Sequence, residues 1–85
     1  MLKINPEINK KFIDFYREVF KDSKLSMKTK ELIAIGVALG AGCGPCYEYH
    51  LKKAKDYGNS DEEIGEAVAV AEVVSSGAVR MTVHK

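Results

Sequence analysis

The chain contains two cysteines, Cys43 and Cys46, and their spacing allows the two sulfurs to meet. Two thiols separated by two residues, in a turn that leads into a helix, can cycle between dithiol and disulfide. Cys46 falls in the first helical turn, where free N–H groups and the helix dipole stabilise a thiolate. In dithiol exchange, one thiolate attacks a substrate disulfide and the second thiol resolves the mixed disulfide. On sequence alone, either sulfur can be the attacking one.

A histidine and a glutamate accompany the cysteines. His50 lies one helical turn after Cys46, so its imidazole shares a helix face with the sulfurs and can accept a thiol proton. Glu31 lies in the amphipathic start of the second helix, just before its apolar run, and a carboxylate that enters a buried segment needs a partner. It can orient the imidazole and stabilise its cation, although an ion pair with Lys28 or Lys30 is an alternative. The predicted catalytic residues are Cys43, Cys46, His50 and Glu31.

Four helices are expected to position these side chains. Asn5 caps the first and Ser26 the second, while Ser60-Asp61-Glu62-Glu63 forms a capping box for the fourth. The expected spans are residues 6–21, 27–39, 44–57 and 61 onward, and Ser76-Gly77 can kink or end the last one. With short connections and no strand pattern, the chain is predicted to be a small all-α helical bundle, one domain over residues 1–85.

Apolar residues exceed what such a bundle can cover. The first helix carries an aromatic stripe, residues 32–39 are apolar nearly all round, and small side chains from Ile64 to Ser75 form a stripe expected to be buried. The aromatic stripe is expected to lie in the core or at a subunit interface.

The spacing of the four candidate residues, E-x11-C-x2-C-x3-H, closely resembles the signature of the alkyl hydroperoxidase D (AhpD)-like group of the carboxymuconolactone decarboxylase family. Residues 25–39 look like the buried helix that precedes the cysteines in that family. Residues 60–71 look like the capped helix that follows them. The resemblance covers residues 12–80, most of the chain.

The resemblance implies an all-α fold and a thiol–disulfide oxidoreductase linked to peroxide defence. It also implies a helix-mediated homo-oligomer, a trimer or hexamer, which would account for the surplus of apolar surface. Glu31 and His50 would form a proton relay that serves both thiols. The expected partner is a small-molecule dithiol or a protein disulfide such as that of a peroxiredoxin, with no cofactor and no resident metal. This chain has Pro45 where AhpD carries an additional histidine, and it is shorter, so lipoamide dependence is not assumed.

Other interpretations remain open. The two cysteines with His50 and Glu31 offer acceptable zinc ligands, or the cysteines are purely structural. A c-type haem is excluded because Tyr47 follows Cys46. A carboxymuconolactone decarboxylase-type lyase would need a cationic pocket, and Arg80 lies far along the chain from the motif. A non-enzymatic redox sensor would need the same activated thiol.

The formal charge of +1 and the mixed signs along the chain show no basic stripe for nucleic acid or a membrane surface. With no signal-peptide pattern, a cytoplasmic location is expected. Tyr47 and Tyr49 can line a substrate pocket or pack at a subunit contact. Glu48 and His84 are expected at the surface, and Lys52, Lys53 and Lys55 on a solvated face.

Overall fold

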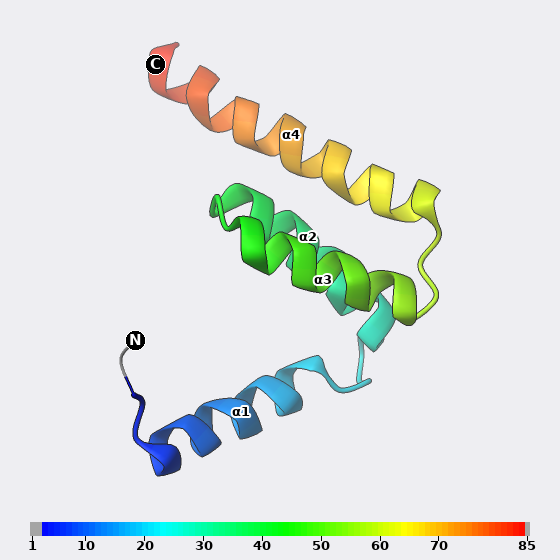
Figure 1. The fold of residues 1–85 in the computed structure, drawn as a ribbon. Helices are drawn as coiled ribbons and strands as arrows, with labels where there is room; N and C mark the ends of the chain where they lie inside the picture. The colour runs from blue at the N-terminus through cyan, green and yellow to red at the C-terminus, as the bar shows by residue number, and fades with distance from the viewer. Residues whose placement is uncertain (1–2, 85) are drawn as a thin grey trace.

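The computed structural model describes residues 3–84, which form four helices. They are α1 (Pro6–Phe20), α2 (Met27–Gly40), α3 (Gly44–Asp56) and α4 (Asp61–Val83). The pair α2 and α3 lies at the centre, with α4 on one side and α1 on the other (Figure 1). No strand occurs within residues 3–84, so the prediction of an all-α fold is confirmed. None of these helices is long and apolar enough to cross a membrane.

The helices begin where the sequence predicts, because polar side chains bind the free backbone N–H groups of the first turns. The Asn5 side chain accepts from the N–H groups of Glu7 and Ile8 at 2.9 and 3.3 Å. Ser60 and Glu63 form the predicted capping box, in which Ser60 N–H donates to Glu63 Oε1 at 2.8 Å. This hydrogen bond holds the pKa of Glu63 below its usual value.

Two glycines with positive φ end the two central helices. Gly42 (φ 69°) follows α2, and Gly58 (φ 94°) follows α3. After α2, the N–H of Cys43 donates to the carbonyl of Ala38 at 2.9 Å, which closes a Schellman motif. The turn therefore delivers Cys43 directly from the end of α2 to the start of α3.

The core lies where α2 meets α3 and α4. Its buried members are Ile35, Ala54 and Ile64, one from each of these helices. Partly buried side chains surround them: Leu32, Leu39, Tyr47, Leu51 and Val68. This small core fixes α2 against α3, the two helices that carry the predicted catalytic residues.

Two predictions about apolar burial are wrong for the single chain. Helix α4 continues through Ser76-Gly77, and its C-terminal half extends past the core, so that Val74 and Ser75 are exposed. On α2, Ile33 and Val37 are 50% and 64% exposed, and they line an open hollow together with Val70 and Val74 of α4.

Helix α1 is loosely attached to the rest of the chain. It has no buried residue and makes sparse contact with α2. Lys30 anchors its C-terminal end, because Nζ donates to the carbonyls of Val19 and Lys21 at 2.7 Å each. The radius of gyration is 15.4 Å, compared with about 12 Å for a compact chain of this length. The arrangement is open, with apolar faces of α1 and α4 left uncovered.

Candidate active site

A disulfide joins Cys43 and Cys46 at the start of α3, with the two Cα atoms 5.3 Å apart. Cys43 is the N-cap residue of α3, and its sulfur accepts the N–H of Cys46 at 3.2 Å. Pro45 lies in the first turn between them. The predicted meeting of the two sulfurs is confirmed. Cys46 is exposed, whereas Cys43 is half-buried.

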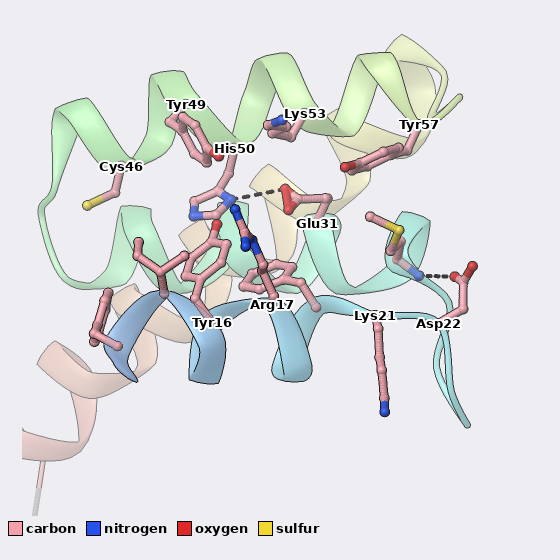
Figure 2. Close-up of a pocket in the computed structure, with 14 residues that line it drawn as sticks. Tyr16, Arg17, Lys21, Asp22, Glu31, Cys46, Tyr49, His50, Lys53 and Tyr57 are labelled. Carbon is pink, nitrogen blue, oxygen red and sulfur yellow. Dashed lines mark hydrogen bonds and ion pairs between the residues drawn. The ribbon is translucent and has the colours of Figure 1, made fainter. Parts of the chain in front are cut away.

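The imidazole of His50 and the carboxylate of Glu31 form a pair between α3 and α2. Nδ1 of His50 lies 3.0 Å from Oε2 of Glu31 (Figure 2). Glu31 is 2% exposed, and the side chain of His50 is 14% exposed. A buried carboxylate needs a charged or hydrogen-bonding partner, and with Nδ1 protonated the ring provides it. The other ring nitrogen lies on the side toward Cys46 (Figure 2).

The alternative partners of Glu31 are engaged elsewhere. Nζ of Lys28 lies 3.6 Å from Oε2 of Glu63 on α4. Nζ of Lys30 donates to backbone carbonyls at the end of α1. The structure therefore brings Glu31 to His50 and not to a neighbouring lysine.

Aromatic rings hold the imidazole in place. The ring of Phe20 stacks on His50 with centroids 5.6 Å apart, and Tyr49 meets it edge-on at 5.0 Å. Tyr16 stacks on Phe20 at 4.6 Å and also on His50 at 6.5 Å. Burial raises the pKa of Tyr16 to about 12, and the nearby Tyr49 and Glu31 act in the same direction. Helix α1 thus contributes two of the three rings around His50.

Two openings reach this site. A cleft of about 930 Å³ between α1 and α3 is lined by Cys46, His50 and Glu31. A second, more apolar groove of about 520 Å³ is lined by Cys43, Cys46 and His50. Cys46 and His50 therefore face both spaces, whereas Cys43 faces only the second.

The structure also locates several residues whose surroundings the sequence left open or predicted differently. Tyr47 packs against the core, while Tyr49 lines the larger cleft. Glu48 and His84 are exposed, as predicted. Lys53 was expected on a solvated face, but it lines the cleft, with Nζ 5.6 Å from the centroid of the Tyr49 ring.

Arg17 is the residue that sequence reasoning missed. It lines the cleft from α1, opposite α3 (Figure 2). Its helical position on the same side of α1 as Phe20 was the available signal. The distance of Arg80 from the motif therefore does not show that the site lacks an arginine.

The described residues, 3–84, contain no group of three or more His, Cys, Asp or Glu side chains placed to hold a metal ion. In the disulfide form neither sulfur is a thiolate, which is the form that binds zinc. The same four residues that were considered as zinc ligands are instead arranged as a disulfide and a separate hydrogen-bonded pair.

Comparison with known proteins gives consistent matches along the chain. The family model described as "Carboxymuconolactone decarboxylase family" matches residues 6–83. A curated relative, "Uncharacterized protein 4 in cox locus" of Paracoccus denitrificans, is 37% identical over 78 residues, which are 92% of this chain and 70% of that protein.

Two crystal structures share the fold over nearly the whole chain. A protein from Methanobacterium thermoautotrophicum is 29% identical with a TM-score of 0.87, and the match covers 98% of this chain and 95% of that one. A carboxymuconolactone decarboxylase family protein from Thermotoga maritima, whose description suggests involvement in an antioxidative response, is 33% identical with a TM-score of 0.78. That match covers 95% of this chain and 88% of the other.

Proposed function

The chain belongs to the carboxymuconolactone decarboxylase family, and from this premise we propose that it is a thiol–disulfide oxidoreductase of the AhpD-like group. The observation that carries the proposal is the exposed sulfur of Cys46, joined to Cys43 and followed one turn later by a His50 that is paired with buried Glu31. The antioxidative role suggested for the Thermotoga maritima relative agrees with a peroxide-linked activity.

We assign Cys46 as the residue whose sulfur attacks the substrate. It is exposed, it faces both openings, and the free nitrogen of His50 lies on its side. Cys43 is half-buried and faces only the apolar groove. Cys43 is the N-cap residue of α3, and its sulfur accepts the backbone N–H of Cys46. This hydrogen bond and the helix dipole stabilise the thiolate that Cys43 needs when it resolves the mixed disulfide.

The reaction of the reduced protein has two steps. The Cys46 thiolate attacks one sulfur of a substrate disulfide, whose S–S bond breaks and whose second sulfur leaves with the electron pair and takes up a proton. The Cys43 thiolate then attacks Cys46, and the first sulfur of the substrate leaves in the same way. The protein ends as the Cys43–Cys46 disulfide, and the substrate ends as two thiols.

His50 and Glu31 serve the protons of these steps. His50 accepts the proton of the attacking thiol and returns it to the leaving thiolate, while Glu31 holds the ring and stabilises its cation. An external dithiol reduces the Cys43–Cys46 disulfide again. With an alkyl hydroperoxide in place of the disulfide, Cys46 becomes a sulfenic acid and the alcohol leaves; Cys43 then condenses with it and releases water.

A trapping experiment tests the assignment of the two sulfurs. The Cys43→Ser variant is expected to form one stable mixed disulfide with a small disulfide substrate, detected at Cys46 by intact mass and peptide mapping. The Cys46→Ser variant is expected to trap none at a comparable rate, and both variants lose turnover with a dithiol reductant. Full turnover in both variants would refute the oxidoreductase function.

A matched pair of histidine variants tests the relay. His50→Gln is expected to lower kcat/KM about 100-fold or more, the usual range for loss of a general acid–base. His84→Gln is the control, because His84 is exposed at the end of α4 and is the other histidine of the chain. Equal activity of the two variants would remove His50 from the mechanism.

A lyase of the carboxymuconolactone decarboxylase type is the second candidate, because Arg17 and Lys53 supply cations in the cleft. That reaction does not require the cysteine pair. A Cys43→Ser/Cys46→Ser double variant that still consumes a carboxymuconolactone would support the lyase over the oxidoreductase.

We also propose that the chain works as a homo-oligomer, with a trimer or hexamer as the expected size. The apolar side chains of α1 and α4 that a single chain leaves open include Phe12, Phe15, Val73 and Met81, all more than half exposed. Light scattering coupled to gel filtration measures the mass directly. A monomer at micromolar concentration would contradict the proposal.

A further inference from the structure

Two cations line the cleft that contains Cys46 and His50, one from each of the helices on its two sides. Arg17 comes from α1 and Lys53 from α3, and both line this space (Figure 2). Within residues 3–84, neither forms an ion pair with a carboxylate. Their neighbours on the same helices are paired, Lys21 with Glu18 at 2.6 Å and Lys52 with Asp56 at 2.9 Å.

The carboxylates that line the cleft do not neutralise these cations. Glu31 is bound to His50, and Asp22 accepts the backbone N–H of Met27 at 2.7 Å at the start of α2. Lys21 also lines the cleft but points away from α3 (Figure 2). Lys10, which is paired with Asp14 on the same helix, lowers the pKa of that carboxyl, and Arg17 adds to this effect. Arg17 and Lys53 therefore line the cleft without an ion-pair partner of their own within residues 3–84.

We propose that Arg17 and Lys53 form a carboxylate-binding subsite that selects disulfide substrates with an anionic tail. This inference rests on the proposed oxidoreductase function and names its substrate class. A guanidinium binds a carboxylate through two parallel hydrogen bonds, and a lysine adds a point charge. Lys53 is held beside the ring of Tyr49, so its position in the cleft is partly fixed.

The spacing along α3 sets the length of the substrate. Cys46 and Lys53 are seven residues apart and lie on one helix face, which places them roughly 10 Å apart along the axis. Tyr49 and His50 lie between them on α3, and Phe12 and Ile13 line the cleft from α1. The subsite therefore fits a disulfide sulfur at one end, several methylene groups, and a carboxylate at the other end.

In the reaction with such a substrate, the Cys46 thiolate displaces one sulfur and the carboxylate stays between Arg17 and Lys53. The S–S bond of the substrate breaks, its leaving sulfur takes the electron pair and a proton, and Cys43 then releases the second thiol. The external dithiol of the proposed function supplies the two electrons for the next turnover.

Three matched disulfides test the subsite: the symmetric disulfides of mercaptohexanoate, of its primary amide and of aminohexanethiol. They share chain length and differ in charge. The wild-type protein is expected to reduce the carboxylate form with a kcat/KM at least about tenfold above the amide, with the amine form slowest. The advantage should shrink as salt is raised, because the cations are partly exposed.

Arg17→Gln and Lys53→Gln are each expected to remove most of this advantage, measured as the ratio of kcat/KM for the carboxylate form to that for the amide form. Lys52→Gln is the control: it removes the same charge from the same helix, at a side chain that is 78% exposed and paired with Asp56. It should retain the wild-type preference.

The possible failures are distinguishable. If none of the three disulfides is reduced, the proposed function itself fails. If all three are reduced equally, or if Lys52→Gln lowers the preference as much as Lys53→Gln, the function stands and the subsite is refuted. A change in oligomer mass in Arg17→Gln with an unchanged preference would assign Arg17 to a subunit contact and also refute the subsite.

Discussion

Replacing His50 with alanine should destabilise the protein strongly, and a second substitution at Glu31 should restore part of the loss. Glu31 is 2% exposed, and His50 is its one side-chain partner in the described residues, at 3.0 Å. Removing the partner of a buried charge costs about 3–5 kcal/mol, because the charge is left without compensation. For a chain of this length, total stability is roughly 4–13 kcal/mol, so the loss is a large fraction.

The double variant Glu31→Gln/His50→Ala carries no buried charge. We expect it to be more stable than His50→Ala by about 2 kcal/mol, since a neutral amide without a partner costs about 1–3 kcal/mol. Each kcal/mol corresponds to about 4–8 °C in Tm for a domain of this size. The second substitution should therefore raise Tm by roughly 10 °C. The single Glu31→Gln variant keeps a neutral hydrogen bond to the ring and should lose only about 1 kcal/mol.

Thermal and urea unfolding, followed by circular dichroism, measure these differences. All variants must be compared at one protein concentration, because oligomerisation makes Tm depend on concentration. If the double variant is no more stable than His50→Ala, Glu31 is not an uncompensated charge in the single variant. That result would refute the description of Glu31 as a buried carboxylate that depends on His50 as its hydrogen-bond partner.

Three further predictions concern the elements that support the site. Burial raises the pKa of Tyr16 to about 12 from the usual 10.0. The stabilisation that comes from keeping this phenol protonated in the folded state is therefore complete below pH 10 and lost as pH rises through 12. Tyr16→Phe should lack this alkaline loss of stability in a pH series of urea unfolding. Ser60→Ala removes the N-cap of α4 and should cost about 1 kcal/mol, measured by urea unfolding; an unchanged midpoint would contradict the cap. Lys30→Met removes two hydrogen bonds that hold the end of α1, so amide exchange in α1 should rise while that in α3 stays unchanged.

Local sequence patterns were sufficient to predict the four helices and the residues at which they begin. Asn5, Ser26 and Ser60 cap the predicted helices because their side chains reach backbone N–H groups only a few residues away. The meeting of the two cysteines is equally local, since both lie in one turn. The pairing of Glu31 with His50 could be anticipated from chemical need, because a carboxylate entering an apolar helix requires a partner.

Burial was predicted less well, because it depends on neighbours that periodicity does not identify. Val74 lies on the predicted apolar stripe of α4 yet is 66% exposed, since it borders an open hollow between α4 and α2. Tyr47 and Tyr49 are two residues apart in sequence, and only their positions on α3 show that the first packs in the core and the second lines the cleft.

The sequence by itself determined the elements and the redox pair, because caps, turns and a two-residue spacing act over one or two helical turns. Only the tertiary structure decided that α1 places Phe20 on His50 and Arg17 opposite Lys53. These contacts join segments far apart along the chain, and they depend on the path of residues 21–26 and on the bonds from Lys30. Such a path is set by packing and hydrogen bonding in three dimensions, which no local pattern records.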